Sequence, residues 1–344
     1  MTRKIGYARA HTNIALIKYW GKKDHELFLP MNSSLSLTLD AFYTDTQVIF
    51  DSSFAEDTLT INGELQPSDE INGLVRFLNV IREKEQTDLK AHVISHNIVP
   101  TAAGLASSAS AYAALTGAIA QAFNWQLDHQ ALSRIARRGS GSATRSLFGG
   151  FVEWEMGVDD ETSQAIPIDD AQWDIGMLVM ILTRQKKDIS SRVGMQHTVE
   201  TSPFYTNWVE TAAQDLKQMK AAIYRQDFQT VGELTEHSAM KMHATTFSAN
   251  PPFFYFEPET IHAIRIIQAL RKQGHHIYYT LDAGPNLKVL GKRSELESVR
   301  QALLEHYSSD QLILTQAGPG MRQLSADEWA SLYPTREEDT SHDH

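Results

Sequence analysis

Small and hydroxyl-bearing residues are concentrated between positions 100 and 110, in the segment PTAAGLASSAS. Residues 90–98 before it are predicted to form a strand, and the Ala-rich residues 108–123 after it are predicted to form a helix. A loop between a strand and a helix lies at the first N–H groups of the helix and at the positive end of its dipole, where phosphate binds well. Ser107 and Ser108 could cap the helix, face a phosphate or bind the cation of that phosphate. The segment is therefore a candidate phosphate site.

A simpler interpretation of the same segment stays open, because a capped helix after a loop needs the same residue types. The segment is not a Walker A loop, since no Gly-Lys-Ser/Thr follows Gly104, and it lacks the three spaced glycines of a Rossmann fingerprint. Its significance therefore depends on the motifs elsewhere in the chain.

Two further clusters combine hydroxyl groups with an arginine. Residues 140–142 (Ser-Gly-Ser) precede a short helix predicted over 143–147, which carries Arg145, and residues 190–192 (Ser-Ser-Arg) repeat the combination. Arginine suits a carboxylate, because its planar fork can hydrogen-bond to both oxygens. Residues 140–145 are equally compatible with a Gly-Ser connector that carries a surface arginine.

Asp282 is the carboxylate best placed for catalysis. It follows an apolar strand predicted over 277–281 and precedes a Gly-Pro turn, so its side chain should project beyond the strand end. A partly buried carboxylate near several cations stays ionised and can orient a substrate hydroxyl or accept its proton. Aspartate is also common in turns that have no catalytic role, and this alternative remains open.

Positive charge is clustered although the protein is acidic overall. The formal net charge of −11 argues against nucleic acid or an anionic membrane as a partner. Three locally basic stretches nevertheless indicate a pocket for a small polyanion, while solvated helix faces would explain Arg134 and Lys23. The cations are Lys18, Lys22 and Lys23 in the first stretch, Arg134, Arg137, Arg138 and Arg145 in the second, and Arg184, Lys186, Lys187 and Arg192 in the third.

The length of 344 residues predicts two domains. A strand over 175–183 is expected to close the first half, and the order helix–strand–strand–helix–strand over 259–315 is an α+β pattern. The polar, acidic residues from 335 onward are predicted to be disordered. No apolar run reaches the roughly 20 residues that span a bilayer, no signal peptide is expected, and the absence of cysteine excludes disulfides and zinc–thiolate sites. We therefore expect a cytoplasmic protein.

Six segments together resemble the GHMP kinase superfamily and, within it, the diphosphomevalonate decarboxylase family. They are residues 11–22 (HTNIALIKYWGK), 100–110, 138–150 (RGSGSATRSLFGG), 190–192, 242–246 (MHATT) and 282–286 (DAGPN). The similarity extends from about residue 8 to about residue 320. Two departures are Thr144, where the family often has cysteine, and Val193, where a polar residue is expected. Of these, Thr144 could alter the packing beside Arg145.

The resemblance implies a two-domain α+β GHMP kinase fold with the active site in the cleft between the domains. A ribosomal-protein-S5-like domain would cover residues 1–183 and a ferredoxin-like domain residues 184–334, followed by the tail at 335–344. The implied reaction is the ATP-dependent decarboxylation of mevalonate 5-diphosphate to isopentenyl diphosphate, with release of ADP, phosphate and carbon dioxide. ATP, Mg²⁺ and a homodimer are implied as well. A substrate with a carboxylate and a diphosphate would explain clustered cations on an acidic protein.

The resemblance also implies roles for individual residues. Arg145 would pair with the carboxylate that is lost, Asp282 would orient or deprotonate the tertiary 3-hydroxyl, and Lys187 would assist near the phosphoryl group. The implied diphosphate ligands are Lys18 (also a catalytic candidate), Tyr19, Lys22, Ser140, Gly141, Ser142, Ser191 and Arg192. The implied ATP contacts are Asn97, Pro100, Ala103, Gly104, Leu105, Ala106, Ser107 and Ser108, with Ser107 and Asp282 as Mg²⁺ ligands.

Two other functions stay open at this point. A GHMP-type small-molecule kinase, such as a mevalonate or phosphomevalonate kinase, would share the ATP loop but stop after phosphorylation. Arg145 with its Ser-Gly-Ser start, together with Asp282, favours the decarboxylase. A catalytically silent relative would bind nucleotide without turnover and would be expected to lack Asp282 or Lys18, and this chain has both.

Overall fold

The first sheet is built around two long neighbouring strands, β1 (Arg3–Ile17) and β4 (Ser34–Asp51), which pair antiparallel along most of their lengths. The computed structural model describes residues 3–98, 107–185 and 187–334, and within them this sheet has eight strands. Along β4 the second neighbour changes, from β8 at residues 34–37 to β7 at residues 43–51. The remaining strands are β5 (Thr58–Ile61), β6 (Glu64–Leu65), β7 (Lys90–Ile98), β8 (Phe151–Trp154), β9 (Ala165–Asp169) and β14 (Arg322–Gln323).

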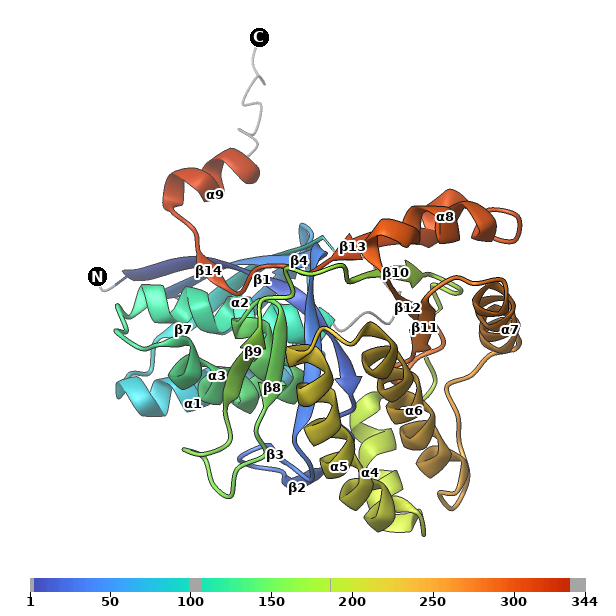
Figure 1. The fold of residues 1–344 in the computed structure, drawn as a ribbon. Helices are drawn as coiled ribbons and strands as arrows, with labels where there is room; N and C mark the ends of the chain where they lie inside the picture. Colours follow the sequence, from blue (N-terminus) through green and yellow to red (C-terminus); the bar gives the residue numbers. More distant parts are fainter. Residues whose placement is uncertain (1–2, 99–106, 186, 335–344) are drawn as a thin grey trace.

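Helices α1 (Asn72–Glu85), α2 (Ser107–Ala122) and α3 (His129–Gly139) cover one face of this sheet (Figure 1). The small alanines of α2 let it lie close to β1 and β4. At one point the approach requires glycine, because a Cβ on Gly6 of β1 would lie 1.9 Å from the carbonyl oxygen of Ala118. The helix predicted over 108–123 is therefore confirmed, and its second half lies against β1.

The second sheet has the order β11 (Ile277–Thr280), β12 (Leu287–Gly291), β10 (Gly176–Met180) and β13 (Leu312–Gln316), with all neighbours antiparallel. Helices α7 (Pro258–Lys272) and α8 (Arg293–Leu303) pack on one face, where Leu287 and Val289 are buried. Leu290 points to the opposite face and joins a second core, as the two-residue period of a strand requires. The chain between α8 and β13 forms a short 3₁₀ helix, η2 (Ser309–Gln311).

A shared apolar core joins the two halves of the molecule. Helices α5 (Tyr205–Tyr224) and α6 (Phe228–Phe247) pack together and contribute to it, as do β1, β4 and β10. In Figure 1, α4 (Ser191–Thr201), α5 and α6 lie together below the second sheet and beside the small hairpin of β2 (Lys22–Asp24) and β3 (Leu29–Pro30). This packing places the end of β1 beside α6, where the backbone N–H of Lys18 donates to Ser238 Oγ at 3.1 Å.

Three features differ from the sequence-based expectations. The strand expected to close the first half lies in the second sheet, because β10 pairs with β12 and β13 rather than with the strands before it. Near the C-terminus, β14 returns to pair with β1, and α9 (Ala326–Leu332) follows it. Helix α4 was not predicted. Ser190 caps it, accepting a hydrogen bond from the backbone N–H of Val193.

Candidate active site

Asp282 and Lys18 lie 264 residues apart in the chain and meet at the junction of the two domains. Lys18 follows the last residue of β1, and Asp282 lies in the turn between β11 and β12. The Lys18 ammonium donates to Asp282 Oδ1 at 2.8 Å and to the carbonyl oxygen of Ala15 at 2.7 Å. Only 2% of the Lys18 side chain is exposed, against 25% of that of Asp282. The carboxylate is therefore the solvent-facing partner of a largely buried ion pair.

A second cation, Lys288, lies on the other side of the same carboxylate. Its ammonium is 3.6 Å from Asp282 Oδ2, and the residue has no exposed surface. Oδ2 itself is a buried atom and has no hydrogen-bond partner within the described residues. Sequence reasoning missed Lys288, although a single charge inside the apolar strand β12 was a signal that could have found it.

Opposing effects act on the pKa of Asp282. Burial alone raises this pKa, but the nearby charges of Lys18, Lys288 and Arg145 outweigh burial and lower it well below its ordinary value. Burial lowers the pKa of the Lys18 ammonium, and Asp282 partly offsets this. Asp282 is consequently a carboxylate at neutral pH. Lys18, Lys288, Asp282 and Arg145 are called the buried centre below.

Arg145 enters the buried centre from the 3₁₀ helix η1 (Gly141–Leu147) and is 2% exposed. It donates from Nη1 to Ser34 Oγ at 2.5 Å and from Nε to Asn13 Oδ1 at 3.3 Å. Burial lowers its pKa to about 10, although Asp282 opposes that shift, so the guanidinium stays protonated at neutral pH. The sequence predicted Arg145 at the site, but it did not predict that Ser34 and Asn13 accept hydrogen bonds from it.

The Ser-Gly-Ser segment links η1 to the first turn of α2. Ser140 donates to Ser108 Oγ at 3.3 Å, and it lies 3.2 Å from Ser142 Oγ. A Cβ on Gly141 would lie 2.7 Å from the Trp154 ring and 3.1 Å from Tyr19, so this position has no room for a side chain. The structure therefore gathers the hydroxyls of three predicted ligands at one place.

Tyr19 and Asn97 have different surroundings. Burial raises the pKa of the Tyr19 phenol, and the ring lies 4.8 Å from that of Trp154. The side-chain oxygen of Asn97, at the end of β7, accepts from Thr44 at 2.9 Å. The other predicted ATP contacts, Pro100 and residues 103–106, lie outside the described residues, as do the side chain of Ser107 and the tail at 335–344.

Lys187 bridges two parts of the second domain that flank Asp282. Its ammonium donates to Ser191 Oγ and to the carbonyl oxygen of Ala283, both at 2.7 Å. Burial lowers its pKa, and the charge of Lys288 adds to this, whereas Asp282 opposes it. The charge of Asp282 therefore acts on the Lys187 ammonium. Lys187 nevertheless forms no ion pair within the described residues.

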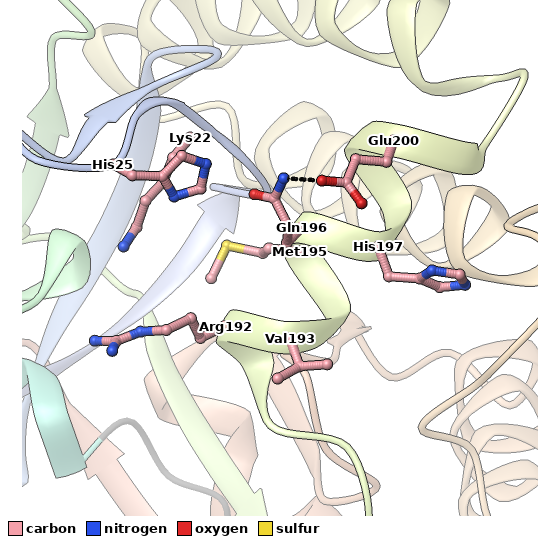
Figure 2. Close-up of a pocket in the computed structure, with 8 residues that line it drawn as sticks. All are labelled: Lys22, His25, Arg192, Val193, Met195, Gln196, His197 and Glu200. Carbon is pink, nitrogen blue, oxygen red and sulfur yellow. Dashed lines mark hydrogen bonds between the residues drawn. The ribbon is translucent and has the colours of Figure 1, made fainter.

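Lys22 and Arg192 line a cavity of about 570 Å³ between the β2–β3 hairpin and α4, called the outer pocket below. Figure 2 shows their side chains extending to the same side of the view, with Met195 between the hairpin and the helix. The Lys22 ammonium lies 3.4 Å from the centre of the Phe28 ring, and the Arg192 guanidinium lies 5.9 Å from it. Burial and the charge of Arg192 lower the pKa of Lys22 to about 8. Neither cation forms an ion pair within the described part of the chain.

The turn before Lys22 needs glycine. Gly21 has φ +115°, and a Cβ there would lie 1.8 Å from the Tyr205 hydroxyl, which donates to the carbonyl oxygen of Trp20 at 2.6 Å. Because of this turn, Lys18 lies in the buried centre while Lys22, only four residues later, lines the outer pocket.

Several cations of the predicted basic stretches pair elsewhere. Arg137 and Arg138 pair with Asp160, and Arg134 pairs with Glu161 at 3.4 Å, so the second stretch contributes only Arg145 to the site. Arg184 pairs with Asp310 on the surface at 3.0 Å, and Lys186 lies outside the described residues. Sequence position alone could not separate these cations, because the carboxylates that pair with them lie far along the chain.

The donors around the start of α2 suit a nucleotide with its metal ion. Ser108 is exposed there, beside the hydroxyls of Ser140 and Ser142. Mg²⁺ prefers oxygen ligands and is commonly held by one or two protein oxygens together with substrate phosphates. Within the described residues, no group of three or more His, Cys, Asp or Glu side chains could hold a metal ion. The serine hydroxyls and the Asp282 carboxylate are thus the available donors of the right kind.

Comparison with known proteins identifies the family. Residues 10–165 match a family described as the diphosphomevalonate decarboxylase-like N-terminal domain, and residues 177–339 match the mevalonate 5-diphosphate decarboxylase C-terminal domain. A diphosphomevalonate decarboxylase of Candida albicans is 36% identical over 350 residues, covering 92% of this chain and 97% of the relative. The chain belongs to the diphosphomevalonate decarboxylase family. The family expected from the six sequence segments is confirmed.

Solved structures of the family share this fold. A mevalonate diphosphate decarboxylase from Enterococcus faecalis, described with a mevalonate diphosphate-mediated mechanism of ATP binding, is 48% identical with a TM-score of 0.90. A structure described as MDDEF in complex with MVAPP, AMPPCP and magnesium is 48% identical with a TM-score of 0.91. Each match covers 94% of this chain and 100% of the chain in the solved structure. The expected two-domain α+β fold is confirmed.

Among the helices of the described residues, none combines the length and apolar character needed to cross a bilayer.

Proposed function

We propose that this chain converts mevalonate 5-diphosphate and ATP into isopentenyl diphosphate, ADP, phosphate and carbon dioxide. The observation that carries the proposal is the state of Asp282. Its Oδ1 is held by Lys18, its Oδ2 is buried, 25% of its side chain is exposed, and nearby cations keep the group ionised. Such a carboxylate can accept a hydrogen bond from a substrate hydroxyl at its exposed side, because each of its oxygens has two lone pairs.

The two ends of the substrate match the two cationic regions. The diphosphate would bind Lys22 and Arg192 in the outer pocket, together with Tyr19, Gly141, Ser191 and the hydroxyls of Ser140 and Ser142. The carboxylate would bind Arg145, whose guanidinium can hydrogen-bond to both oxygens. Ser108 and residues 103–107 would hold the ATP phosphates at the start of α2, with Asn97, Pro100, Ser107 and Asp282 among the proposed ATP or metal contacts. When bound, Mg²⁺ would neutralise charge on the phosphates, through Ser107 and Asp282 in this proposal.

The chemistry follows from this placement. The 3-hydroxyl oxygen, held by Asp282, attacks the γ-phosphorus of ATP, and ADP leaves. Because the pKa of Asp282 is low, the carboxylate is a weak base, so it orients the hydroxyl and takes the proton only as the O–P bond forms. The new phosphate ester then leaves from the tertiary carbon, and the electron pair of the C–CO₂ bond forms the carbon–carbon double bond. Lys18 and Lys187 are proposed to stabilise the negative charge of the transferring phosphoryl group.

The test is to incubate the protein with ATP, Mg²⁺ and mevalonate 5-diphosphate labelled at the carboxyl carbon. We expect ADP, phosphate and labelled carbon dioxide in a ratio of one to one to one. A kinase of the same superfamily would release ADP without free phosphate or carbon dioxide, and a binding protein would release none of the three. Either result would reject the proposal.

A homodimer in the cytoplasm is also proposed, from the family resemblance alone. Light scattering during gel filtration would measure the molar mass of the native protein. A value near that of one chain at micromolar concentration would reject the dimer.

A further inference from the structure

Lys288 occupies a position that packing alone would give to an apolar residue. On β12, Leu287 and Val289 face the helices α7 and α8, whereas Lys288 and Leu290 face the core shared with the first domain. Lysine is rarely buried completely, because removing an ammonium from water is costly unless a partner compensates. The position therefore points to an electrostatic role.

The partners of Lys288 are few. Its ammonium donates to the carbonyl oxygen of Asn286 at 3.2 Å and lies 3.6 Å from Asp282 Oδ2, its closest carboxylate within the described residues. Asp282 is also the ion-pair partner of Lys18. Two buried cations thus share one carboxylate. This surplus of positive charge is unfavourable in the free protein but suits a site that receives anionic phosphates.

The two lysines act on Asp282 differently. Lys18 hydrogen-bonds to Oδ1 at 2.8 Å, which uses one of the two lone pairs of that oxygen. Lys288 is too far from Oδ2 for a hydrogen bond but close enough for strong attraction in a poorly hydrated site. The attraction favours one orientation of the carboxylate, in which Oδ2 is buried and another part of the side chain is exposed.

We propose that Lys288 is a positioning residue of this site, which holds Oδ2 of Asp282 on the buried side so that Oδ1 stays on Lys18 and the exposed side of the carboxylate faces the substrate hydroxyl. This inference rests on the proposed function. It assigns Lys288 no contact with the substrate, since its effect passes through Asp282. Substrate affinity, which depends mainly on the outer pocket and Arg145, should be nearly independent of Lys288.

The first experiment replaces Lys288 by methionine, which has a similar length and no charge. We expect kcat for carbon dioxide release to fall about 10- to 100-fold, while KM for mevalonate 5-diphosphate changes less than about twofold. Lys292→Met is the matched control, because Lys292 is a partly exposed lysine just beyond the same strand. A merely structural role would lower thermal stability without this separation of kcat from KM.

The second experiment is a double-mutant cycle with Asp282→Asn, measured by single-turnover release of labelled carbon dioxide. If Lys288 acts through Asp282, adding Lys288→Met to Asp282→Asn should change the residual rate less than about twofold. The double variant should also melt at a higher temperature than Asp282→Asn, because it removes one of two cations left without a carboxylate. Should Lys288→Met fail to fold, Lys288→Gln would replace it in both experiments.

The outcomes separate this inference from the proposed function. If the wild-type protein releases no carbon dioxide, the proposed function fails and the inference fails with it. If the wild-type protein is active and a folded Lys288 variant keeps its kcat, the inference alone is wrong. The inference is also overturned if the fold-losses in rate of the two single variants multiply to give the loss of the double variant, because the two residues would then act independently.

Discussion

The buried centre and the outer pocket both concentrate positive charge, but they organise it in opposite ways. In the buried centre, Lys18 and Lys288 share Asp282 and are almost fully enclosed by protein. In the outer pocket, Lys22 and Arg192 have no carboxylate partner within the described residues and lie against the Phe28 ring beside an open cavity. A buried, internally paired cluster holds geometry, whereas unpaired cations at a cavity attract a ligand. We therefore expect changes at Asp282 and its two lysines to lower kcat and changes in the outer pocket to raise KM.

The largest expected effect comes from Asp282→Asn. Asparagine has nearly the same shape but neither the charge nor the basic oxygen, so kcat should fall about 10²- to 10⁴-fold. KM for mevalonate 5-diphosphate should change little. The measurement is steady-state release of phosphate and labelled carbon dioxide. Asp310→Asn is the control, since Asp310 pairs with Arg184 on the surface. An unchanged kcat in Asp282→Asn would remove Asp282 from the chemistry.

The next effect is expected from Arg145→Lys. Lysine keeps the charge but loses the planar fork that Ser34 and Asn13 hold in place, so kcat/KM should fall about 10- to 100-fold. The same assay over a range of substrate concentrations would measure this. Arg134→Lys is the control, because Arg134 pairs with the exposed Glu161. Equal losses in the two variants would show that Arg145 has no specific role.

A smaller and different effect is expected from Lys22→Met. Removing one cation from the outer pocket should raise KM for mevalonate 5-diphosphate about tenfold, because ground-state and transition-state binding weaken together and kcat is preserved. Calorimetric titration with the substrate should show the same loss of affinity. Lys23→Met is the control, since this neighbour is exposed. If kcat fell while KM stayed constant, the contrast between the two regions would be lost.

The smallest effect is a pH dependence. The pKa of Lys22 is about 8, so its ammonium is charged below that pH and loses its charge as the pH rises through it. Arg145, with a pKa of about 10, keeps its charge over the same interval. We therefore expect kcat/KM to fall a few-fold between about pH 7.5 and pH 9 while kcat stays level. In Lys22→Met this fall should disappear. A wild-type kcat/KM that is level across the interval would contradict the assignment.

Much of this architecture could be predicted from local sequence, and what was missed depends on distant contacts. The alanines of α2 and the apolar run before Asp282 predict their elements directly. The sharing of Asp282 between Lys18 and Lys288 could not be predicted from local sequence, because it depends on how the two domains meet. Likewise the local sequence of β10 predicts a buried strand. Its partners, β12 and β13, come more than a hundred residues later.

The return of β14 to the first sheet has a consequence for synthesis of the protein. β14 pairs with Ala8 and Arg9 of β1, and the Tyr333 hydroxyl donates to Asp45 at 2.8 Å. About 150 residues separate the end of β9 from β14, which a ribosome adds in about 8–30 s. Throughout that interval the outer side of β1 lacks its last neighbour, and unpaired strand edges promote aggregation. The first strand of the nascent chain thus becomes paired on both edges only after β14 has been synthesised.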